Sequence, residues 1–157
     1  MALKADRIEA YTDISFFMNT TATRGGVVTM LTAGSGASMD DANAVVVYAA
    51  NPSGLVPMGI LLNDVVDLDL TRQHINWHKD EVQKGSKVTL LRQGQVTTDM
   101  IAAAAAPGVG SGVYIGASGL LTTVAVATSG VSNGISCGRF LSSKDADGFC
   151  KVDINIT

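Results

Sequence analysis

The chain has 157 residues and a formal net charge of −3, with 16% charged and 46% hydrophobic residues. This length suits one domain, or one domain with an arm. The few basic residues argue against a nucleic-acid partner, because neutralising a run of phosphates requires many Lys and Arg side chains. No apolar run approaches the roughly 18 to 20 residues that span a membrane, and residues 1–13 lack a signal-peptide pattern. We therefore expect neither a nucleic-acid nor a membrane partner, and synthesis in the cytoplasm.

The charged fraction is lower than the value of about 25% that is usual in soluble domains. A chain with so few charges is short of ordinary solvated surface. We therefore expect either a compact β-rich domain or a surface that lies against a partner.

Residues 1–25 differ from the rest of the chain. They contain apolar residues without sustained alternation or a helical stripe, so we expect an extended arm outside the domain. Fully extended, a segment of this length reaches roughly 80 Å, which is ample to touch a neighbouring subunit. Phe16, Phe17 and Met18 are its candidate anchors, and the two consecutive phenylalanines would point to opposite sides. The alternative is that one of them covers the domain's own core.

Residues 26–157 alternate short apolar segments with turns rich in Gly, Ser, Asn and Asp. This pattern predicts an all-β fold, a small barrel or sandwich of about nine short strands. We expect hairpins around the sequences RQGQ, ASG and KDADG. The run IAAAAAP fits a helical turn or a loop equally well. In the last strand the core-facing residues would be Cys150, Val152, Ile154 and Ile156.

The two cysteines, Cys137 and Cys150, flank the last expected hairpin. A turn centred near Ala146 places Cys150 opposite about Ser142 and Cys137 opposite about Asn155. Sulfurs so far out of register cannot form a disulfide. We predict two free thiols, with Cys150 buried.

The segment 61–82 contains both histidines and the only Trp. On a helix, His74 and His78 would face one metal ion, with a third ligand from Asp64, Asp80 or Glu81. The flanking sequence favours strands, however, so we interpret the segment as a polar connection without a metal. Trp77 suits a core and an interface equally.

No other pattern in the chain indicates a reactive centre. Asp67 and Asp69 are typical of the solvated face of a strand, and the glycine-rich segments lack the strand, helix and Lys of a phosphate loop. We therefore expect no catalytic residue, no metal and no cofactor.

Three segments, residues 24–41, 57–91 and 135–156, together resemble the capsid decoration, or cement, proteins of tailed bacteriophages. The resemblance covers most of the chain from Arg24 onward, and NDVVDLDLTRQHINWHKDEV is its most distinctive part. It implies a non-enzymatic virion protein, made in the host bacterial cytoplasm, that sits on the outside of an icosahedral head. There it would clamp neighbouring major capsid subunits, itself a dimer or trimer.

This resemblance suggests two contact surfaces. The arm would contact capsid or a sister subunit through Phe16, Phe17, Met18 and Arg24. A second contact would use Arg72, His74, Trp77 and His78. The alternatives are another phage component, such as a tail tube, adaptor or fibre base, and, least favoured, a metal-dependent module using His74 and His78.

Overall fold

The computed structural model describes residues 2–31, 44–67 and 81–157, and their regular secondary structure is almost entirely β-strand. The elements are β1 (Ile8–Met18), β2 (Val27–Met30), β3 (Val45–Val47), β4 (Pro57–Leu61), β5 (Asp64–Val66), β6 (Glu81–Gln83), β7 (Lys87–Thr98), β8 (Gly112–Ile115), the short 3-10 helix η1 (Ala117–Gly119), β9 (Leu121–Thr122), β10 (Ser136–Phe140) and β11 (Cys150–Asn155). The all-β prediction is confirmed. No helix in the described ranges is long and apolar enough to cross a membrane.

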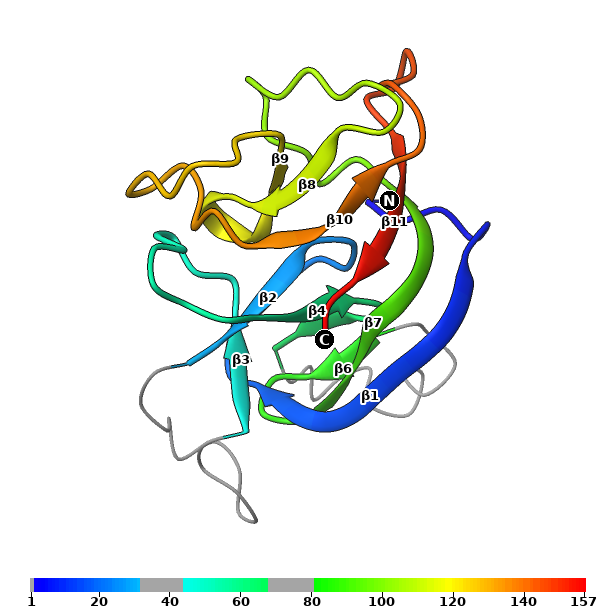
Figure 1. Ribbon diagram of the computed structural model, residues 1–157. Coiled ribbons are helices and arrows are strands. Elements are labelled where there is room, and N and C mark those ends of the chain that lie inside the picture. Colours follow the sequence, from blue (N-terminus) through cyan, green and yellow to red (C-terminus); the bar gives the residue numbers. More distant parts are fainter. Residues whose placement is uncertain (1, 32–43, 68–80) are drawn as a thin grey trace.

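Nine of these strands form one mixed sheet in the order β1-β3-β2-β4-β7-β11-β10-β8-β9, and β5 and β6 form a small parallel sheet. Because β1 also pairs with β7, the pairings β1-β3-β2-β4-β7 return to β1. Figure 1 shows the long β1 and β7 curving side by side, with β8, β9 and β10 at the other end of the molecule. The large sheet therefore wraps around its own core.

The structure corrects the placement of the N-terminal residues on an arm outside the domain. Ile8–Met18 form β1, which pairs antiparallel with β7 and, at Phe17 and Met18, parallel with β3. The preceding residues are also held on the domain, because Asp99 N and Thr98 Oγ1 both donate to Ala2 O, at 3.1 and 2.9 Å. Burial and pairing thus hold this segment against its own sheet.

The hairpin expected around RQGQ is wrong. Lys87–Thr98 form the single 12-residue strand β7, which continues without interruption through residues 92–95. On one edge these residues pair with β1, and on the other edge with β11. The hydrogen-bonded pairings with β1 and β11 therefore keep residues 92–95 extended, although their composition favours a turn.

The other two hairpins are confirmed. β8 and β9 pair antiparallel around η1, and β10 and β11 pair with Arg139 opposite Asp153. In the last turn, Asp145 Oδ1 accepts hydrogen bonds from Asp147 N and Phe149 N, at 3.0 and 2.8 Å. The side chain of Asp145 thereby fixes the turn and, with it, the register.

The core divides into two clusters of buried residues. The larger fills the space around β7, β8, β10 and β11, and the smaller lies under β1, β2, β3 and β4. The predicted inward face of the last strand is confirmed, since Cys150, Val152, Ile154 and Ile156 all belong to the larger cluster.

Both cysteines are free and Cys150 is buried, as predicted. Cys137 is buried as well, and the burial of both should make them unreactive. Burial raises the pKa of the Cys137 thiol to about 12, and the Cys150 thiol donates to Ser142 O at 2.7 Å. Since the thiolate is the reactive form, we expect an aromatic disulfide reagent to label no thiol in the native protein and both after denaturation. Rapid labelling of the native protein would contradict the buried placement.

Candidate docking surface

The contact residues predicted on the arm lie at different depths. Phe16 and Met18 belong to the smaller core cluster, with 9% and 0% of their surface exposed. Phe17 is half-buried, and the Lys87 ammonium lies 5.6 Å from the centre of its ring. The structure thus corrects the placement of Phe16 and Met18 on a free surface, and one phenylalanine covers the domain's own core. Arg72, His74, Trp77 and His78 lie outside the described residues.

Arg24 connects two parts of the fold. Its backbone N–H donates to Asp64 Oδ1 at 2.8 Å, and its Nε lies 4.0 Å from Asp64 Oδ2. Only 12% of the Arg24 side chain is exposed. Its cationic group is therefore directed toward β5 more than toward solvent.

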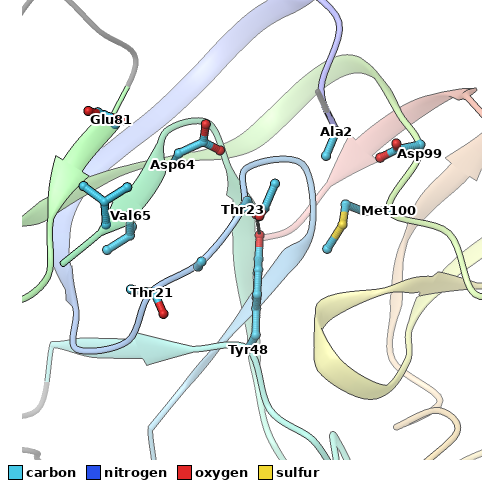
Figure 2. A pocket seen from close by; sticks show the side chains of 11 residues that line it. Ala2, Thr21, Thr23, Tyr48, Asp64, Val65, Glu81, Asp99 and Met100 are labelled. Atoms are coloured by element: carbon cyan, nitrogen blue, oxygen red, sulfur yellow. Dashed lines mark hydrogen bonds between the residues drawn. The ribbon is translucent and has the colours of Figure 1, made fainter. Parts of the chain in front are cut away.

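A cleft of about 730 Å³ opens beside this pair (Figure 2). Figure 2 shows the Tyr48 ring standing in the cleft with its hydroxyl directed at Thr23. That hydroxyl donates to Thr23 O at 2.5 Å and accepts from Gly26 N at 3.2 Å. Burial raises the pKa of the Tyr48 phenol above its usual value. Tyr48 is thus a structural bridge that stays protonated, unsuited to general base chemistry.

Carboxylates at the cleft do not form a metal centre. Asp64, Glu81 and Asp99 line it, and Figure 2 shows them on different parts of the wall. Within the described ranges, no group of three or more His, Cys, Asp or Glu residues is placed to hold a metal ion. His74 and His78 fall outside these ranges.

Nine large apolar side chains are exposed in the described part of the chain, and eight of them fall into two groups. The first group, which we term the valine rim, comprises Val56, Val124, Val126, Val131 and Ile135. The second, the β1 stripe, comprises Ile8, Tyr11 and Ile14. The remaining one, Val109, is 80% exposed. Exposed apolar side chains that gather in this way indicate a contact with another molecule.

The valine rim is built from two loops that are hydrogen-bonded to each other. Asn51 donates through Nδ2 to Ser129 Oγ and accepts at Oδ1 from Gly130 N, both at 3.0 Å. Asn133 Nδ2 donates to Leu55 O at 2.9 Å. In Figure 1 the loop before β4 and the loop between β9 and β10 project on the same side of the molecule. The two loops thus support the exposed valines on a defined scaffold.

Both loops of the rim come from segments without charge. No Asp, Glu, Lys or Arg occurs in residues 42–63 or 100–138. A groove of about 150 Å³, lined by Val56 and Ile135 among others, lies beside the rim. An uncharged apolar surface with a groove suits the core of a protein–protein interface, where charged residues are depleted. This signal was present in the sequence as two long charge-free segments.

These features define an all-β protein with an exposed apolar rim and, within the described residues, no cluster of potential metal ligands. The family model of the phage structural cement protein (E217 gp24/Pam3 gp6) matches residues 5–155. The chain therefore belongs to this family, and its role is structural and associated with the phage capsid. A search of curated proteins found no match.

Proposed function

We propose that this protein binds the outer surface of an icosahedral phage head and clamps neighbouring subunits of the major capsid protein through the valine rim. The observation that carries the proposal is the rim itself: five exposed apolar side chains on two loops from charge-free segments. Burying these side chains against capsid stabilises the complex by removing apolar surface from water.

Clamping requires contact with more than one capsid subunit. A specific interface buries roughly 1,600 Å² in total, so the rim would be one part of the contact. We propose the segment with Arg72, His74, Trp77 and His78 as a second contact. Weak contacts to two subunits at once hold a clamp far more tightly than either alone. The protein would act on the capsid as a dimer or trimer, after synthesis in the host cytoplasm, without nucleic acid or membrane as partner.

Capsids lacking this protein provide a direct test. We expect Val126→Asp to weaken cosedimentation with such capsids by at least about tenfold, equivalent to about 1.4 kcal/mol of binding free energy. Val126 is 70% exposed, so the substitution should leave the thermal unfolding temperature unchanged while placing a carboxylate in the apolar contact.

Val109→Asp is the matched control, because Val109 is 80% exposed, lies in the same charge-free segment and is outside the rim. It should bind capsids within about twofold of the wild type, a difference of less than about 0.5 kcal/mol. Equal binding by the two variants would refute the rim as the docking surface. Failure of the wild type to bind capsids at all would refute the function.

A further inference from the structure

The loop between β9 and β10 contains Asn133, the only asparagine in the chain that is followed by glycine. An asparagine side chain loses ammonia spontaneously when the backbone nitrogen of the next residue attacks its Cγ atom. A following glycine favours this attack, because it has no Cβ atom to hinder the approach and its backbone reaches more conformations. Asparagine is accordingly one of the thermolabile residues of proteins. The proposed capsid contact makes no use of this chemistry.

The fold requires both Asn133 and Gly134. Gly134 has a φ of +72°, and a Cβ atom there would stand 2.9 Å from Ala127 N. Asn133 Nδ2 donates to Leu55 O at 2.9 Å, which connects this loop to the loop before β4. Asn133 also fixes its own turn, because its Oδ1 accepts from Ile135 N at 3.0 Å. A chemically reactive pair therefore serves a structural purpose in the loops of the valine rim.

Native hydrogen bonds oppose the reaction at the atoms that would take part in it. The nucleophile is the Gly134 nitrogen, and its N–H donates to Ser132 Oγ at 3.1 Å. This bond keeps on the nitrogen the proton that must leave before attack. The leaving group is Asn133 Nδ2, which is bound to Leu55 O, while Oδ1 is bound to Ile135 N. Rotation of the carboxamide toward the nucleophile would strain or break these two bonds.

Burial of the pair opposes the reaction further. Asn133 is 8% exposed and Ser132 is fully buried. The Gly134 nitrogen is an anion once its proton has left, and the oxygen on Asn133 Cγ becomes negative as the new bond forms. Both charges are disfavoured where water is excluded. The native environment therefore raises the barrier to the reaction, and opening of the loop removes this protection.

We infer that Asn133 is a latent deamidation site, which the native fold protects and which converts to aspartate and isoaspartate when the loop opens. Hydroxide removes the Gly134 amide proton, and the nitrogen bonds to Asn133 Cγ. Nδ2 takes up a proton and leaves as ammonia, which closes a succinimide ring. Water then attacks either ring carbonyl: attack at Cγ gives aspartate, and attack at the backbone carbonyl carbon gives isoaspartate. The overall change adds one water and releases one ammonia.

The consequence of the reaction, though not the chemistry, rests on the proposed function. Either product lacks the amide group that donates to Leu55 O, so the connection between the two loops is lost. Either product also adds a carboxylate to residues 100–138, which contain no charged side chain. Deamidated protein should therefore bind capsids more weakly than intact protein.

Peptide mass spectrometry of the full-length protein, incubated at mildly alkaline pH, tests the inference. We expect Asn133 to deamidate at least about tenfold more slowly in the native protein than in guanidinium chloride, because the native protein reacts only after local opening. In the denaturant Asn133 should react before the other asparagines, since each of those is followed by a residue with a Cβ atom.

Ser132→Ala isolates the hydrogen bond to the nucleophile. In the native protein it should accelerate deamidation of Asn133 by about fivefold, which corresponds to the net contribution of one hydrogen bond. In denaturant its rate should equal that of the wild type. Ser129→Ala is the matched control, because Ser129 Oγ accepts from Asn51 Nδ2 in place of Gly134 N. Its native rate should stay within about twofold of the wild type, and thermal unfolding confirms that both variants are folded.

Equal rates in native and denatured wild type would overturn the inference, as would a denatured chain whose Asn133 does not react. Equal acceleration by the two serine variants would overturn the role of Ser132. Cosedimentation of the separated intact and deamidated forms with capsids tests the consequence. Weaker binding of the deamidated form supports it, and equal binding refutes it. If neither form binds capsids, the proposed function fails, whereas the result of mass spectrometry stands.

Discussion

Replacing Gly94 with Ala is expected to lower the free energy of unfolding by about 3–5 kcal/mol. Gly94 lies inside β7 with a φ of +148°, and a Cβ atom there would stand 2.0 Å from Ile8 O of the paired strand β1. That carbonyl belongs to backbone paired with β7, so it cannot yield without breaking the β1–β7 ladder. The substitution should separate the two longest strands of the sheet.

Gly85→Ala is the matched control. Gly85 also has a positive φ, +82°, but a Cβ atom there would meet nothing within 4 Å. This variant therefore shows only the cost of the backbone conformation, about 1 kcal/mol. Urea denaturation followed by fluorescence measures both free energies. If the two variants lose equal stability, the close approach of β1 to Gly94 is refuted.

Gly94 also shows why the central strand was predicted wrongly. A glycine between glutamines, flanked by apolar runs, is a common hairpin signal. Here the glycine instead allows β1 to approach β7 closely, and β7 pairs with β1 on one edge and with β11 on the other. Local sequence does not distinguish these uses, because the deciding contacts come from residues far away in the chain.

The N-terminal strand was missed for a related reason. Strand prediction depends on a period of two, and each register shift in β1 interrupts that period. Six of its first eight residues are exposed, namely Ile8, Glu9, Ala10, Tyr11, Ile14 and Ser15. Because β1 buries only Phe16 and Met18, near its end, its sequence shows no alternation of apolar and polar residues.

Features determined locally were predicted correctly. The register of the last hairpin followed from its turn, and the structure pairs Arg139 with Asp153 and Phe140 with Val152, as a turn near Ala146 requires. The contact surface was less accessible to prediction. The charge-free segments could be read directly, but their meeting in one rim depends on the hydrogen bonds of Asn51 and Asn133.

Phe140→Ala is expected to cost about 3–5 kcal/mol of unfolding free energy. Phe140 is fully buried, and it is the largest of the fully buried side chains in the described part of the chain. It lies on β10, between β8 and β11, and all three strands contribute to the larger core cluster. Removing the ring leaves a cavity that the closely paired strands cannot collapse to fill.

Two variants determine whether volume is the cause. Phe140→Leu should restore most of the lost stability, because it returns much of the apolar volume. Phe149→Ala, which removes a half-buried ring stacked with the Lys4 ammonium at 4.3 Å, should cost no more than about 1 kcal/mol. Equal losses for the two alanine variants would contradict the central position of Phe140.

The same experiment connects the core to the docking surface. β10 follows directly on the loop that carries Val124, Val126, Val131 and Ile135. A destabilised Phe140→Ala protein should bind capsids less well in proportion to the fraction unfolded, so lowering the temperature should restore binding. Val126→Asp should stay deficient at every temperature at which it is folded. That difference separates loss of the scaffold from loss of the contact, since only a rim substitution changes the surface that the folded protein offers.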